Sequence, residues 1–129
     1  MLQYKKQIIF ERNGNVQIRN TPSFLTSKQV RQLQCKRVIT QGSRGGILYD
    51  GKAVAAYPAF RVNAVDSNGA GDVFHGAFAA AVMMGYAYGK CCLFASAVSA
   101  LKCTGIGARE SAPNIESVKK FLKENGYEL

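Results

Sequence analysis

The sequence has no apolar run long enough to cross a bilayer, because its longest one, at residues 77–84, is short and rich in alanine. Its first ten residues also lack the long apolar segment of a secretory signal, since only Ile8, Ile9 and Phe10 follow one another there. The four cysteines show no C-x-x-C spacing, which argues against a zinc site and a disulfide framework. We therefore predict a cytoplasmic protein with reduced, buried thiols and no membrane partner.

Acidic side chains are scarce, since eight Asp and Glu stand against 17 Lys and Arg, for a formal net charge of +9. Such a charge is typical of nucleic-acid binders, but here no basic run is longer than two residues and no aromatic side chains are interleaved with one. We therefore predict a solvated basic surface that accepts a phosphate-bearing ligand, and no nucleic-acid partner.

Strand-like patterns come first along the chain and helical patterns follow. Asn13-Gly14 stands between two strand-like runs within residues 6–20, which predicts a β-hairpin with a type I′ turn. Further strands are expected at 37–40, 46–50 and 53–57, and helices at 27–33, 69–85, 90–103 and 115–125. Because no linker or repeat interrupts this order, we predict one α/β domain, residues 1–129, with helices packed on at least one face of a single sheet.

The segment from Asp66 to Asp72 joins an extended run to the start of a helix. Gly69 and Gly71 have no Cβ, so a ligand can approach the backbone where the first N–H groups of the helix have no internal acceptor. Together with the helix dipole, these N–H groups attract anions. Asp72 in the first turn is well placed to accept a proton from an alcohol that attacks a bound phosphoryl group. Ordinary helix capping explains the same residue types equally well.

These residues resemble a signature of the ribokinase-like, or PfkB, carbohydrate kinases, usually written D-T-x-G-A-G-D-x-F. The match comprises residues 66–72, Phe74 and residues 76–78, and only Ser67, in place of Thr, departs from the signature. The resemblance implies that Gly69, Ala70 and Gly71 form an anion hole and that Asp72 is the catalytic base. It further implies transfer of a phosphoryl group from ATP, with Mg²⁺, to a hydroxyl of a sugar-like substrate.

Two other segments extend the resemblance. Residues 38–46 are similar to the family's T-x-G-x-x-G turn, which implies that Thr40, Gly42 and Gly45 contact the nucleotide, although a tight strand connection uses glycine too. Residues 94–98 and 105–113 look like the helix and loop around adenine, which assigns Ala95 to the nucleotide. By the same resemblance Asp66, Asn68, Gly107 and Ser111 would surround a potassium ion, although a plain glycine-rich loop accounts for the downstream pattern equally well.

Two single residues near these motifs have open roles. His75, the lone histidine, is expected to be a packing or surface residue, and Arg109 either reaches a phosphate or faces solvent.

The resemblance covers residues 38–122, the C-terminal nucleotide-binding part of a family member, and implies a partial ribokinase-like (Rossmann-like) sheet with helices packed on it. The expected hairpin and short helix of residues 1–37 have no clear family counterpart. The sugar-binding signature, the lid strands and the acidic motif of the family have no counterpart here. We therefore expect an incomplete kinase with weak or no activity on its own and an unidentified sugar or nucleoside substrate. The alternative is a non-catalytic nucleotide-binding or self-association module, a homo-oligomer whose exposed strand edges and apolar faces drive assembly.

Overall fold

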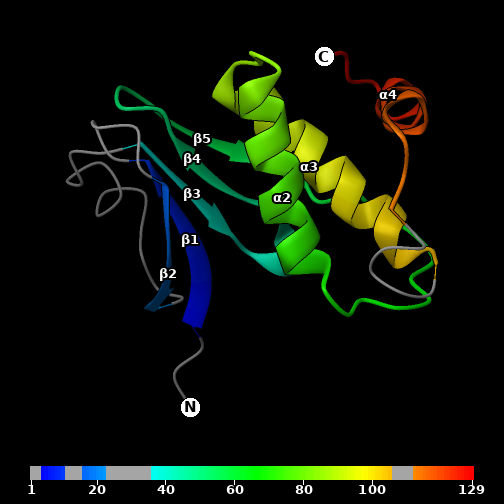
Figure 1. The fold of residues 1–129 in the computed structure, drawn as a ribbon, viewed down its shortest axis with the longest axis horizontal. Helices are drawn as coiled ribbons and strands as arrows, with labels where there is room; N and C mark the ends of the chain where they lie inside the picture. The colour runs from blue at the N-terminus through cyan, green and yellow to red at the C-terminus, as the bar shows by residue number, and fades with distance from the viewer. Residues whose placement is uncertain (1–3, 11–15, 23–35, 106–111) are drawn as a thin grey trace. The chain divides into compact units, whose positions relative to one another are not determined.

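The computed structural model describes residues 4–10, 16–22, 36–105 and 112–129, with side chains from Val38 onward (Figure 1). The chain divides into two compact units, Met1–Tyr57 and Pro58–Leu129, and each is described by itself. The first unit contains the sheet and the second contains the helices. No helix in these described ranges is both long and apolar enough to span a membrane.

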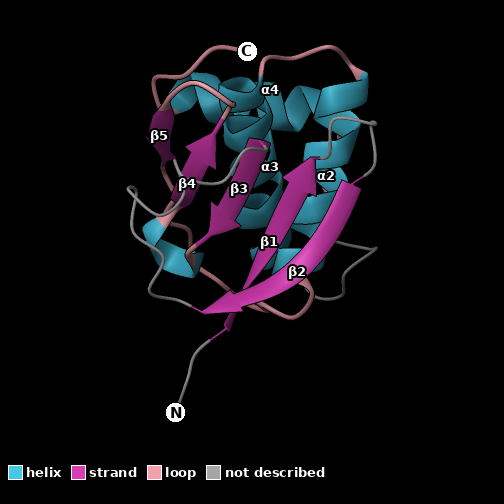
Figure 2. Cartoon of the chain, turned by 90° about the vertical axis from the view of Figure 1, so that its left-hand side faces the viewer, coloured by secondary structure: helices cyan, strands magenta, loops and turns pink. Residues whose placement is uncertain are grey.

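The first unit is a five-stranded sheet in the order β2-β1-β3-β4-β5 (Figure 2). Its strands are β1 (Tyr4–Phe10), β2 (Val16–Pro22), β3 (Lys36–Thr40), β4 (Gly46–Tyr49) and β5 (Val54–Tyr57). All four pairings are antiparallel, with Phe10 opposite Val16 in the hairpin and Thr40 opposite Gly46 between β3 and β4. The α/β class and the N-terminal hairpin are confirmed. The described strands do not include the parallel pairings that dominate a Rossmann-like sheet.

Short turns connect the last three strands. A 3₁₀ helix, η1 (Gly42–Arg44), joins β3 to β4, a detail that the glycine pattern did not predict. Between β4 and β5 the carboxylate of Asp50 accepts hydrogen bonds from the amides of Lys52 and Ala53, at 2.8 and 2.9 Å. These amides favour the charged form and lower the pKa of Asp50 below its ordinary value of 3.8. The bounds of β3, β4 and β5 confirm the predicted strands at 37–40, 46–50 and 53–57 to within one residue.

The described part of the second unit contains three helices, of which the last has a side-chain N-cap. They are α2 (Ala70–Met83), α3 (Tyr88–Cys103) and α4 (Ile115–Glu124). The Asn114 side chain accepts a hydrogen bond from the Ser117 amide at 2.8 Å, so the predicted N-cap of α4 is confirmed. The predicted helices at 69–85, 90–103 and 115–125 are found, although α3 begins two residues earlier than expected. The predicted helix at 27–33 and the turn at Asn13-Gly14 lie outside the described residues.

Aromatic and small side chains form the buried part of this unit. Phe78 is stacked between Phe74 and Tyr88, with ring centroids 6.4 and 6.3 Å away, which joins α2 to the start of α3. Phe60 packs edge-on against Phe121 and Tyr127 at the other end of the unit.

Three of the four cysteines are free thiols in the buried part of α3, as predicted, and Cys35 lies outside the described residues. They are Cys91, Cys92 and Cys103. Burial raises the pKa of the Cys91 and Cys92 thiols.

Candidate active site

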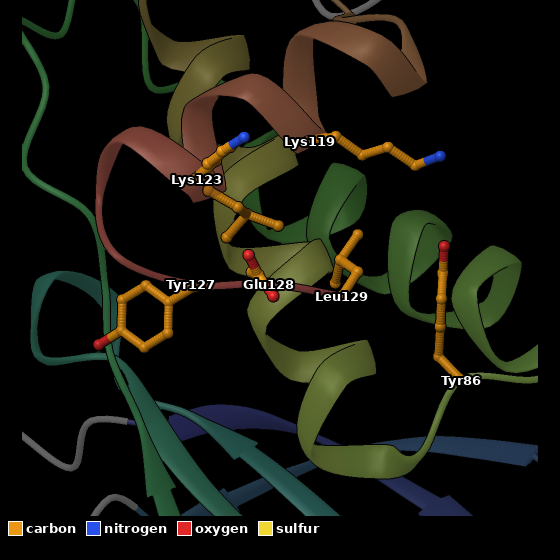
Figure 3. Close-up of a pocket in the computed structure, with 7 residues that line it drawn as sticks. Tyr86, Lys119, Lys123, Tyr127, Glu128 and Leu129 are labelled. Carbon is orange, nitrogen blue, oxygen red and sulfur yellow. The ribbon is translucent and has the colours of Figure 1, made fainter.

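A pocket of about 330 Å³ lies beside α4 and the C-terminal residues (Figure 3). Its lining residues are Tyr86, Lys119, Leu122, Lys123, Tyr127, Glu128 and Leu129. None of them belongs to the motifs that the sequence singles out, so the pocket is not the site that those motifs predict.

The predicted anion hole lies at the start of α2. Gly69 is the N-cap and has a φ of +74°, a left-handed conformation that side chains disfavour. The Val73 amide makes the first helical hydrogen bond, to the Gly69 carbonyl at 2.9 Å, and the Ala70 amide donates to the Ser67 carbonyl at 3.2 Å. Since the early amides of a helix have no partner within it, the amide of exposed Gly71 is one that an anion can approach.

The space beside Gly71 is open. Apart from its chain neighbours and the backbone of its own helix, a Cβ atom placed on this residue would meet no atom within 4 Å, and the residue is exposed. Asp72 follows it in the first turn of α2 and is exposed as well. Gly71 and Asp72 therefore belong to one accessible helix end, as an anion site with an adjacent base requires.

The turn that precedes α2 is fastened to the C-terminal end of α3. The amides of Val65 and Asp66 both donate to the Cys103 carbonyl, at 2.7 and 3.2 Å. The Ser99 hydroxyl donates to the Ala70 carbonyl at 3.0 Å. Within the turn, the Asn68 amide donates to the Asp66 carboxylate at 2.9 Å. The segment that leads to the predicted anion hole is thus hydrogen-bonded to the C-terminal half of α3.

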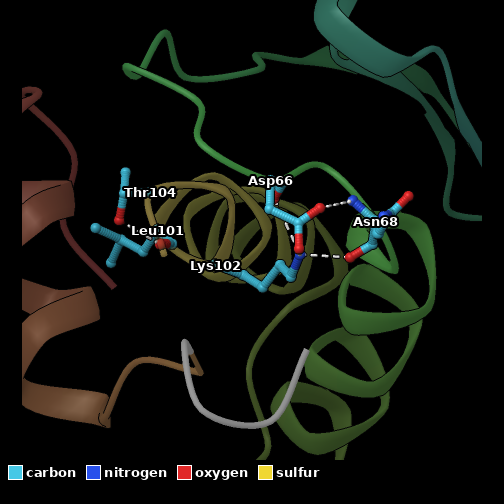
Figure 4. Close-up of polar contacts among 5 residues, drawn as sticks. All are labelled: Asp66, Asn68, Leu101, Lys102 and Thr104. Atoms are coloured by element: carbon cyan, nitrogen blue, oxygen red, sulfur yellow. Dashed lines mark hydrogen bonds and ion pairs between the residues drawn. The ribbon is translucent and has the colours of Figure 1, made fainter. Parts of the chain in front are cut away.

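Lys102 is the central residue of this junction, and the sequence analysis did not identify it (Figure 4). Its side chain is completely buried in the last turn of α3. Its ammonium donates to the backbone carbonyls of Asp66, at 3.0 Å, and of Asn68, and it lies 3.8 Å from the Asp66 carboxylate. A lysine at this position follows the spacing of buried Cys91, Ala95 and Val98 along one helix face, a periodicity that could have revealed it.

Two of the four residues implied as potassium ligands lie beside a lysine ammonium instead. Of the four, Asp66 and Asn68 are described, whereas Gly107 and Ser111 lie outside the described residues, as does Arg109. The carbonyls of Asp66 and Asn68 both accept hydrogen bonds from the Lys102 ammonium. Since a positive charge already lies against these oxygens, a second cation beside them would be repelled.

The remaining predicted nucleotide contacts are distributed over both units. Ala95, in α3, is fully buried. Thr40, Gly42 and Gly45 belong to the first unit, where Gly42 and Gly45 have φ values of +60° and +75°. The Gln41 amide donates to the Gly45 carbonyl at 2.7 Å. Both glycines therefore have a conformational role in the turn, and their contact with a nucleotide stays a prediction.

His75 is buried within α2, so it is a packing residue rather than a surface residue. Its Nδ1 atom is hydrogen-bonded to the Gly71 carbonyl one turn earlier, and its ring makes an edge contact with Phe74. The Nε2 atom is buried and has no hydrogen-bond partner among the described residues. The histidine therefore contacts the first turn of α2, beside the predicted anion hole.

Comparison with known proteins identifies the family of this chain. Residues 18–115 match the family described as pfkB family carbohydrate kinase. The ribokinase of Lactococcus lactis is 31% identical over 103 residues, which cover 80% of this chain and 34% of that protein. Arabidopsis thaliana ribokinase, solved with ribose and ATP, is 35% identical with a TM-score of 0.63, over 67% of this chain and 28% of that one.

A structure described as ribokinase II from E. coli, in complex with ATP and Mg²⁺, is 26% identical with a TM-score of 0.64, over 67% of this chain and 28% of that one. The chain thus spans about a third of the length of the relatives it matches. Because the family match extends over most of its residues, this chain belongs to the pfkB family of carbohydrate kinases.

Proposed function

We propose that this chain supplies the phosphate-binding end and the catalytic base of an ATP-dependent kinase that phosphorylates a hydroxyl of a sugar or nucleoside. The observation that carries the proposal is the open N-terminus of α2, where Gly71 leaves its backbone accessible and exposed Asp72 follows it. The relatives support the substrate class, since one is named a ribokinase and another was solved with ribose and ATP.

The backbone amides of α2 account for stabilisation of the transferring group. A phosphoryl group that passes between two oxygens spreads negative charge over its other three, and preorganised amides lower the energy of that charge. The dipole of α2 adds the equivalent of roughly half a positive charge at the same place. Gly71 contributes by lacking a side chain, because a Cβ atom would occupy the open space beside its amide.

Asp72 supplies the base. Its carboxylate accepts the proton of the attacking hydroxyl as the new phosphorus–oxygen bond forms, and the nucleotide leaves with the electrons of the broken bond. The Mg²⁺ that accompanies ATP screens the charge of the phosphates. No cluster of three or more metal-binding side chains occurs in the described parts of the chain, which fits an ion held largely by phosphate oxygens and water.

Titration calorimetry with ATP–Mg tests the anion hole. Wild-type chain should bind, and Gly71→Ala should weaken binding by about tenfold or more, because the added methyl group blocks the amide. Gly76→Ala is the matched control: this glycine lies in the same helix, is also exposed, and faces open space. Equal affinities of the two variants would contradict the anion hole.

Asp72→Asn tests the base in any longer protein that contains this segment and phosphorylates a sugar. The variant should retain ATP affinity while turnover falls by about 10²- to 10⁴-fold, the usual contribution of a general base. Asp50→Asn, the same change at another exposed aspartate, should leave turnover unaltered. Full turnover by the Asp72 variant would refute the assignment.

A further inference from the structure

The buried ammonium of Lys102 is surrounded by oxygen atoms of one short turn. Two are the backbone carbonyls of Asp66 and Asn68, and the third belongs to the Asp66 carboxylate, 3.8 Å away (Figure 4). A charge taken completely out of water is tolerated only when paired and hydrogen-bonded, and Lys102 meets both conditions within this turn.

The same oxygens need a positive charge. Two carbonyl dipoles and a carboxylate oxygen point at one buried position, next to the C-terminal end of α3, whose last carbonyls carry partial negative charge. A monovalent metal ion or an ammonium group satisfies such a set, since the two have equal charge and similar size. The lysine occupies it here.

We propose that Lys102 is a built-in cation that replaces the monovalent metal ion at this turn and positions the start of α2. Asn68, one of its acceptors, precedes Gly69 and Ala70, so fixing the Asn68 carbonyl fixes the direction in which α2 begins. Lys102 is therefore a positioning residue that acts through the turn, and the chain needs no potassium. Only the link to phosphate binding rests on the proposed function, because the contacts of the ammonium lie within the chain itself.

Thermal unfolding of the wild-type chain without nucleotide is the first test. The melting temperature should be the same in KCl and in tetramethylammonium chloride of equal ionic strength, because the latter cation is too large for the site. If potassium bound to the folded chain, a potassium concentration ten times the dissociation constant would raise the melting temperature by about 5 °C in a domain of this size. A rise of that size in wild-type chain would overturn the proposal.

Lys102→Ala provides the converse test, because the shortened side chain leaves a cavity lined by the same oxygens. We expect a melting temperature lower by about 10 °C, since a buried pair has lost one partner. NH₄Cl or KCl should restore about half of this loss, whereas tetramethylammonium chloride should not. Lys90→Ala is the matched control, being an exposed lysine of the same helix, and should show neither the loss nor the rescue.

Affinity for ATP–Mg separates positioning from plain stability. In the Lys102→Ala variant below its melting temperature, affinity should fall by about tenfold and recover with NH₄Cl. Recovery of stability without any change in affinity would overturn the positioning role. If wild-type chain fails to bind ATP–Mg, the proposed function fails, yet the comparison of melting temperatures in the two salts still tests whether Lys102 is a built-in cation.

Lys102→Met is the second variant in case Lys102→Ala does not fold. It keeps most of the volume of the side chain without its charge, and a Lys102→Met variant as stable as wild type would contradict the proposal.

Discussion

Replacing Asp66 by Asn and Lys102 by Met, singly and together, measures how strongly the buried ion pair holds the turn before α2. The two charged atoms are 3.8 Å apart, and the side chains are 24% and 0% exposed. At an effective dielectric constant of about 20, this separation corresponds to a gross attraction of about 4 kcal/mol. Desolvation offsets part of it, so we expect a coupling free energy of about 2 kcal/mol.

The chain offers a matched comparison at almost the same separation. Lys120 and Glu124, one turn apart in α4, are 3.9 Å apart but 79% and 61% exposed. Water and mobile side chains reduce such a pair to about 0.3–0.5 kcal/mol. The cycle of Lys120→Met and Glu124→Gln should therefore give a coupling several times smaller than the buried pair.

Urea unfolding followed by circular dichroism is the suitable assay, because the sequence contains no tryptophan. Each cycle compares the free energies of unfolding of wild type, two single variants and the double variant, with equal denaturant slopes as the check on two-state behaviour. Asp66→Asn keeps a side-chain oxygen that can accept the hydrogen bond from the Asn68 amide, so the cycle isolates the contribution of the charge. About 1 M NaCl should remove the coupling in α4 and leave most of that at Lys102. Equal couplings at the two sites would refute the reasoning.

Two further predictions concern backbone conformation and pH. Gly69→Ala should lower the free energy of unfolding by about 1–2 kcal/mol, because the φ of Gly69 is +74°. Gly76→Ala should raise the free energy of unfolding by about 0.5–1 kcal/mol, because Gly76 lies inside α2 with open space around it. Urea midpoints measure both changes, and a Gly69→Ala variant as stable as wild type would contradict the left-handed cap. Asp50→Ala should destabilise the chain at neutral pH, because the Ala53 and Lys52 amides lower the pKa of this carboxyl from 3.8 in the fold. A carboxyl whose pKa is lower in the folded state stabilises the fold at pH values above its pKa in the unfolded chain. This stabilisation is lost as the pH falls through the pKa of the folded state, so the difference in stability between wild type and variant should vanish below that lowered pKa. An unchanged difference at about pH 2 would show that the hydrogen bonds do not depend on the charge.

The order of elements and most of their ends could be predicted from local sequence. Periodicity and capping residues placed all three described helices and three strands, because turns and caps depend on neighbouring residues such as Asn114 and Ser117. The 3₁₀ helix at Gly42–Arg44 was missed, since the glycines that permit it fit several turn types equally well. The motif at residues 66–72 could be recognised in the sequence, because each role that it predicts requires a particular residue type: glycine for access to the backbone and aspartate for accepting a proton.

The sequence by itself therefore determined the described helices, three of the strands and the motif from which we propose the anion hole and its base, because all of these depend on short-range geometry. Only the tertiary structure decided the role of Lys102, which is 34 residues from Asn68 and would otherwise be taken for a solvated charge. It also decided that His75 is buried and that Ser99 is bound to Ala70. The physical reason is that a polar side chain can be buried only where distant backbone groups satisfy it, and the packing of α3 beside the turn brings those groups together.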